Sequence, residues 1–113
     1  SNEALCALTA GLYMSTMGPD GMAQAAEQSM AKAHYLADAL CAVDGVKLRY
    51  DGDFFHEFVT DMPRTEEVLA ALSEAGILGG LPVDGGILWC ATEKVTKDAM
   101  DKTATIVKEV LAK

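Results

Sequence analysis

The stretch AGILGGLPVDGGILWCATEK, residues 75–94, decides the fold, because it places five glycines between two apolar runs. Glycines that hold a phosphate expose backbone N–H groups and are followed directly by a helix. Here they are followed by ILWC, residues 87–90, an apolar β-type run, and no Gly-Lys-Ser/Thr or G-x-G-x-x-G motif occurs. The stretch therefore predicts chain reversals and not a phosphate-binding loop.

The residues around these glycines agree with that interpretation. TEEVLAAL, residues 65–72, is typical of a helix that is N-capped by Thr65 and has acidic residues in its first turn. Gly76 stands where a left-handed C-cap is expected. Asp84-Gly85-Gly86 predicts a tight turn into a strand over residues 87–92.

Composition narrows the class of protein. With 113 residues, half of them hydrophobic, we expect a single domain, 1–113, with a real core. The formal net charge of −8 argues against nucleic acid or an anionic membrane as partner. No apolar stretch approaches the roughly 20 residues that span a bilayer, and no signal peptide pattern is present. We therefore expect a soluble, cytoplasmic protein.

The N-terminal part of the chain predicts two helices. Residues 3–14 are apolar nearly all round, and such a helix is covered on most sides. We expect another domain or subunit to cover it and, since the chain begins with Ser1 and not with Met, we expect a fragment of a longer protein. Gly18-Pro19-Asp20 is typical of the start of a second, amphipathic helix. Residues 1–42 are thus predicted to be a helical lead-in.

The remainder, residues 46–113, is predicted to be an α/β sandwich core. VKLRY (46–50) and FFHEFV (54–59) form a hairpin through a turn at 51–53, and Thr96 opens the last helix. The element order is helix, helix, hairpin, helix, strand, helix. This order predicts an α+β fold, a small, mainly antiparallel sheet with helices on one face.

The three cysteines, Cys6, Cys41 and Cys90, have wide, unmatched spacing and no C-x-x-C motif. His34 and His56 are far from each of them in sequence. We expect ordinary buried free thiols, with a zinc site assembled by the fold as the alternative.

Catalytic motifs are missing from the sequence, which has no G-x-S-x-G, no H-E-x-x-H and no calcium loop. We therefore predict no catalytic, cofactor-binding or metal-binding residue. Three residues are candidates for a cleft. Glu57 is a carboxylate on a mostly apolar strand face, where it must pair or face a cleft, and Thr92 and Glu93 end the last strand. For all three the alternative is a solvated position. His56 and Glu57, as strand neighbours, point to opposite faces and make a poor dyad.

Five segments together carry a family resemblance: NEALCALTAGLYMSTMGPDGM (2–22), AHYLADAL (33–40), FFHEFV (54–59), AGILGG (75–80) and CATEK (90–94). In this order and spacing they resemble the C-terminal part of subunit 1 of the decarboxylating glycine dehydrogenase. That enzyme is the P-protein of the glycine cleavage system in its two-subunit form. The resemblance covers essentially the whole chain, although the family leads us to expect Asn at the position of His56.

The resemblance implies the C-terminal small domain of a fold-type I, aspartate-aminotransferase-like enzyme. In this family glycine is decarboxylated with pyridoxal phosphate, and the aminomethyl group passes to the lipoyl arm of the H-protein. The Schiff-base lysine belongs to subunit 2. The fragment is therefore expected to bind no pyridoxal phosphate itself, to be inactive alone, and to serve as a scaffold and active-site wall with subunit 2 as its partner.

Two other interpretations stay open at this point. The first is a stand-alone regulatory domain that binds a small ligand. The second is the small domain of another fold-type I enzyme, such as an aminotransferase or a cysteine desulfurase.

Overall fold

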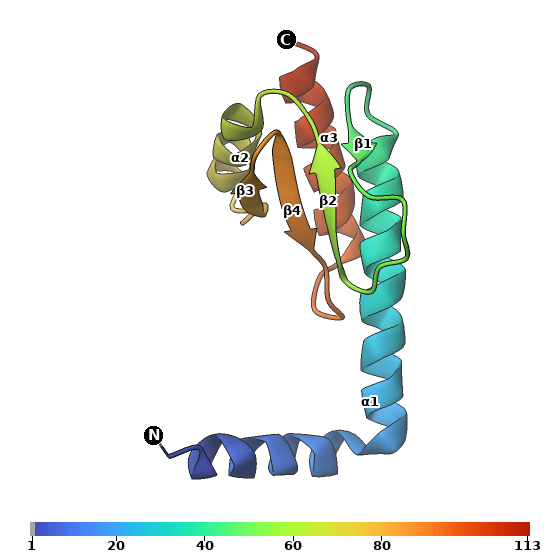
Figure 1. The fold of residues 1–113 in the computed structure, drawn as a ribbon, viewed down its shortest axis with the longest axis vertical. Helices are drawn as coiled ribbons and strands as arrows, with labels where there is room; N and C mark the ends of the chain where they lie inside the picture. Colours follow the sequence, from blue (N-terminus) through green and yellow to red (C-terminus); the bar gives the residue numbers. More distant parts are fainter. Residues whose placement is uncertain (1) are drawn as a thin grey trace.

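The computed structural model describes residues 2–113 and contains three helices and four strands among them (Figure 1). In chain order they are α1 (Ala4–Cys41), β1 (Lys47–Leu48), β2 (Glu57–Asp61), α2 (Thr65–Glu74), β3 (Leu81–Val83), β4 (Gly86–Cys90) and α3 (Lys97–Leu111). The strands form one antiparallel sheet in the order β1-β2-β4-β3. Helices α1 and α2 both pack on α3. The predicted α+β class is confirmed.

Helix α1 changes direction at Gly18, whose backbone is not helical (φ 69°, ψ 172°). Pro19 follows directly and lacks a backbone N–H, so it cannot continue the hydrogen-bond pattern of the first segment. Figure 1 shows residues 4–17, the N-terminal arm, turning sharply away from the rest of the molecule. The predicted boundary between two helices is therefore confirmed.

The core lies between the second segment of α1, the other two helices and the inner face of the sheet. Phe58 and Thr60 of β2 are buried and stand opposite Trp89 and Ile87 of β4. The indole Nε1 of Trp89 donates a hydrogen bond to Thr60 Oγ1 at 2.8 Å. The two central strands thus contribute large side chains and a satisfied polar pair to the core.

The predicted hairpin exists, but its strands differ from the predicted bounds. The second strand begins at Glu57 and not at residue 54, because the chain before it is held by α1. The rings of Phe54 and His34 stack with centroids 4.0 Å apart, and His34 Nε2 lies 2.9 Å from the carbonyl oxygen of Phe54. Phe54 is therefore tied to a helix, and the regular strand begins only after it.

Three further details differ from the expected structure. Thr65 is the first residue of α2, whose cap is Arg64 in the left-handed region (φ 58°) and makes no side-chain capping bond. Strand β3 was not among the predicted elements, and its middle residue is Pro82. Proline is tolerated there since β3 is at the edge of the sheet. The predicted last strand ends at Cys90, two residues early.

The glycines of residues 75–94 turn the chain and allow close packing. Gly76 (φ 78°) and Gly85 (φ 74°) take up left-handed conformations at the two predicted turns. Gly86 lies against β2 so closely that an added Cβ would be 2.1 Å from the carbonyl oxygen of Thr60. At Gly80 it would be 2.3 Å from the carbonyl oxygen of Leu88. The prediction of chain reversal is confirmed. The glycines also allow neighbouring strands to approach each other closely.

Within the described residues, every helix is too short or too polar to cross a membrane.

Replacing Gly86 with alanine is expected to lower the free energy of unfolding by at least about 3 kcal/mol, because the methyl group forces β4 away from the Thr60 carbonyl. Gly52→Ala is the control, since nothing lies within 4 Å of a Cβ added at Gly52. That change should stay within about 0.5 kcal/mol. Urea unfolding followed by Trp89 fluorescence measures both, and equal stability of the two variants would contradict this packing.

Candidate functional site

The N-terminal arm presents large apolar side chains to solvent. Leu5, Leu8 and Leu12 are 74%, 61% and 60% exposed, and Tyr13 and Met14 are about half exposed. Covering a leucine side chain contributes about 1.5–3 kcal/mol, and contiguous exposed apolar surface marks an interaction site. The arm therefore has the character of a contact surface, as the sequence predicts.

A hollow of about 290 Å³ lies between β2 and the loop that precedes it. Its wall is mostly apolar and includes Tyr50 and Phe54 of the loop, Val59 of β2 and Leu88 of β4. Glu57 also lines it and is itself exposed to solvent. The structure therefore places this cleft candidate beside a hollow, and its functional role stays a prediction.

Three chemically different side chains meet where β2 begins and β4 ends. Glu57 stands directly opposite Cys90 in the antiparallel register, and His56 precedes Glu57. One ligand atom of each residue lies within 4.8 Å of the others. The expectation that His56 and Glu57 point to opposite faces is wrong, because β2 begins only at Glu57 and ligand atoms of the two residues lie within 4.8 Å of each other. Cys90 was not predicted to join them, because it lies 33 positions from Glu57 in the sequence and only the strand register brings the two together.

Partial burial raises the pKa of the Cys90 thiol, and the nearby Glu57 carboxylate raises it further. Both effects disfavour the thiolate, so Cys90 is a weak nucleophile when no cation is present. The expectation of buried thiols is wrong for Cys90 and Cys6, which are exposed, while Cys41 is half-buried. The pKa of the Cys41 thiol is also raised, mainly by burial.

The other two cleft candidates, Thr92 and Glu93, form part of a turn between β4 and α3. The backbone N–H of Glu93 donates to Ser29 Oγ at 3.1 Å, and Lys32 Nζ of α1 donates to the Glu93 carbonyl at 2.8 Å. The carbonyl of Thr92 accepts from Val95 N at 3.2 Å. The two bonds of Glu93 fasten the turn to α1, while the bond of Thr92 lies within the turn. Neither Thr92 nor Glu93 lines the hollow beside β2.

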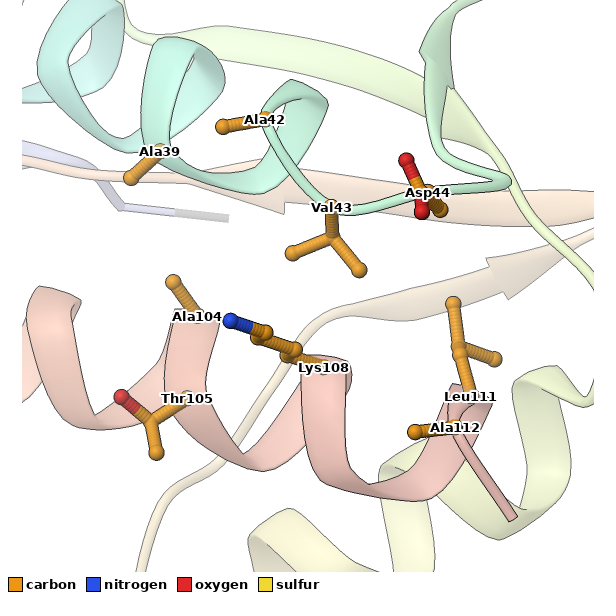
Figure 2. A pocket seen from close by; sticks show the side chains of 9 residues that line it. All are labelled: Ala39, Ala42, Val43, Asp44, Ala104, Thr105, Lys108, Leu111 and Ala112. Atoms are coloured by element: carbon orange, nitrogen blue, oxygen red, sulfur yellow. The ribbon is translucent and has the colours of Figure 1, made fainter.

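A second hollow of about 510 Å³ separates the end of α1 from α3. Figure 2 shows Val43 pointing across it toward Ala104, Lys108 and Leu111 of α3, with Asp44 at the side. The lining side chains are mostly small and aliphatic, and the charged ones are one carboxylate, Asp44, and one amine, Lys108. Among the residues lining this hollow, no nucleophile stands beside a base, so the lining offers packing surface and no reaction chemistry.

The fold defines the class of protein. It matches a crystal structure of glycine decarboxylase (P-protein) of the glycine cleavage system, in inhibitor-bound form, with a TM-score of 0.89 and 33% sequence identity. The match covers 97% of this chain and 26% of that chain. The domain is thus one part of a glycine decarboxylase-like architecture.

The family follows from the sequence itself. Residues 1–107 match the glycine cleavage system P-protein family, and the chain belongs to it. It is 39% identical over 115 residues to the probable glycine dehydrogenase (decarboxylating) subunit 1 of Chlorobium luteolum, covering 97% of this chain and 26% of the relative. The same protein of Prosthecochloris aestuarii is 42% identical over 106 residues, covering 89% and 24%. The chain thus spans about a quarter of the length of these curated relatives.

Replacing Glu57 with glutamine is expected to lower the raised pKa of Cys90, because the change removes the like charge beside the thiol. More thiolate is then present at neutral pH, and alkylation of Cys90 by iodoacetamide becomes faster. Mass spectrometry measures the rate in a chelator-containing buffer, with Glu66→Gln on α2 as the control. A rate that is unchanged or lower in Glu57→Gln would refute the electrostatic coupling.

Proposed function

We propose that this chain is a part of subunit 1 of a decarboxylating glycine dehydrogenase, an oxidoreductase of the glycine cleavage system. The observation that carries the proposal is the match of 97% of the chain to a glycine decarboxylase fold at a TM-score of 0.89. The complete complex decarboxylates glycine with pyridoxal phosphate and passes the aminomethyl group to the lipoyl group of the H-protein. It acts in the cytoplasm.

Within subunit 1 the chain is the C-terminal small domain. The resemblance of the five segments to the C-terminal part of subunit 1 supports this placement. Residues 1–42 are the helical lead-in, and 46–113 are the sandwich core. The buried residues of α1 all follow the kink at Gly18, so the second half of the lead-in packs against this core and only the N-terminal arm projects from it.

The domain does not bind the cofactor itself. A phosphate needs converging N–H and basic groups, but Gly80 and Gly86 are used for strand contact and the hollow beside β2 is lined by Asp53 and Glu57. Lys32, which reaches the core side of the turn, donates to two backbone carbonyls. These residues thus do not fit a pyridoxal phosphate site, which agrees with the family resemblance, where the cofactor and its Schiff-base lysine belong to subunit 2.

The N-terminal arm joins the domain to the rest of the assembly. Its exposed leucines supply apolar contact area, and the relatives are about four times as long as this chain, which leaves ample polypeptide to cover the arm. The occupants are the remainder of subunit 1 and subunit 2. The role of the domain is accordingly to form part of the active-site wall and to keep the two subunits aligned.

The double variant Leu8→Glu/Leu12→Glu, made in complete subunit 1, is expected to reduce glycine-dependent CO2 exchange at least about tenfold, because two carboxylates must be buried without partners. The assay contains subunit 2, pyridoxal phosphate and lipoylated H-protein. Leu78→Glu is the matched control, since Leu78 is 99% exposed and lies outside the arm. It should retain activity.

Full activity of the arm variant would refute the arm as a subunit contact. A second comparison tests the proposed function itself by deleting residues 1–113 from the parent chain. Loss of CO2 exchange while the shortened subunit stays folded supports a part in the decarboxylase. An active shortened pair contradicts it.

One observation favours a second candidate function, the binding of a small ligand in regulation. The hollow beside β2 combines an apolar lining with the Glu57 carboxylate, a combination that suits an amine-bearing molecule. A panel of amino acids should then raise the melting temperature of the chain, since binding to the folded state alone stabilises it. The absence of any shift would exclude this function for the ligands in the panel.

A further inference from the structure

The cluster of His56, Glu57 and Cys90 combines the three kinds of donor that transition metals prefer in proteins. It offers an imidazole nitrogen, a carboxylate oxygen and a sulfur, all within 4.8 Å of one another. In a tetrahedral zinc site, bonds of about 2.0–2.3 Å place the ligand atoms roughly 3.5 Å apart. Side-chain rotations that move the ligand atoms by about 1 Å therefore suffice to close the cluster around an ion.

The backbone pairing of β2 with β4 positions the residues of the cluster. Glu57 and Cys90 are direct partners in the β2–β4 register, so their side chains leave the sheet on the same face. The next backbone bond, from Ala91 N to the His56 carbonyl at 3.0 Å, continues this pairing. The Phe55 ring contacts the His56 ring edge-on with centroids 4.7 Å apart. The backbone thus holds the three donors together without the help of a metal.

His56 supplies a second, independent observation. Its Nδ1 atom is buried and has no hydrogen-bond partner among residues 2–113, and such groups are rare because they lose their bonds to water. An ion coordinated by Nδ1 would satisfy this atom.

We propose that His56, Glu57 and Cys90 form a binding site for a divalent transition metal ion, with Zn²⁺ as the ion that the donor set fits best. A nitrogen, sulfur and carboxylate set excludes Mg²⁺ and Ca²⁺, which take several oxygen ligands. Three protein ligands leave the fourth position to water, because Glu57 and Cys90 are exposed.

Electrostatics agree with the chemistry. The Glu57 carboxylate stands directly opposite Cys90, so the cluster places negative charge where a cation can neutralise it. A divalent ion replaces the thiol proton and compensates both negative charges. The bound ion would connect the start of β2 to the end of β4 and would fix the loop that forms the wall of the neighbouring hollow.

The test titrates the full chain, freed of metal by a chelator, with Zn²⁺ by calorimetry and with Co²⁺ by absorption spectroscopy. One ion per chain is expected, with a thiolate-to-cobalt charge-transfer band. Cys90→Ser should abolish the band, and both Cys90→Ser and His56→Asn should weaken Zn²⁺ binding at least about tenfold. Cys6→Ser, which removes an exposed thiol on the arm, should leave binding and band unchanged.

Melting curves in the presence of chelator show whether each variant is folded. Added Zn²⁺ should raise the melting temperature of the wild-type chain but not that of Cys90→Ser. If Cys90→Ser is unfolded, His56→Asn carries the test. The proposal is overturned if Zn²⁺ does not bind stoichiometrically, if the cobalt band is absent, or if binding survives in the folded site variants.

Discussion

The pairing of β2 with β4 is the contact on which the rest of the structure depends. It brings Trp89 over Phe58, gives the indole N–H its partner in Thr60, and positions the inner face of the sheet against the helices. The pairing is permitted by a glycine, because Gly86 meets the Thr60 carbonyl at a distance that no side chain could accept. The same register determines the outer face, where it sets Glu57 opposite Cys90. A single strand alignment thus organises both the core and the chemically mixed cluster.

The features that local sequence could predict are those with a local cause. The break at Gly18-Pro19, the left-handed turn at Gly76 and the cap at Thr96 each depend on the conformational preference of one or two residues, and each is present. The α+β class followed from the order of these elements. Strand limits were less predictable, because the start of β2 depends on the stacking of Phe54 on His34, a contact across 20 positions.

The residues of the candidate site also differ in whether local sequence could predict their roles. Glu57 was singled out because a carboxylate on an apolar strand is unusual, and it lies both in the wall of a hollow and in the metal-type cluster. Thr92 and Glu93 were singled out by their position at a strand end, but the backbone of Glu93 fastens a turn to α1 and the Thr92 carbonyl accepts a bond within that turn. Cys90 was dismissed because its spacing from any histidine in the sequence carried no motif. Only the strand register reveals its neighbours.

The kink in α1 separates the helix into two parts that need not form together. Pro19 offers no N–H to the preceding turn, so the hydrogen-bond ladder is interrupted at this point, and helical cooperativity does not pass from one segment to the other. The arm carries little buried surface of its own, whereas the second segment is fixed by the core residues Ala33, Leu36, Ala37 and Leu40. The body can therefore reach its native packing while the arm is still unfolded, and the arm can order later on whatever surface receives it. Docking of the arm can thus follow the folding of the body.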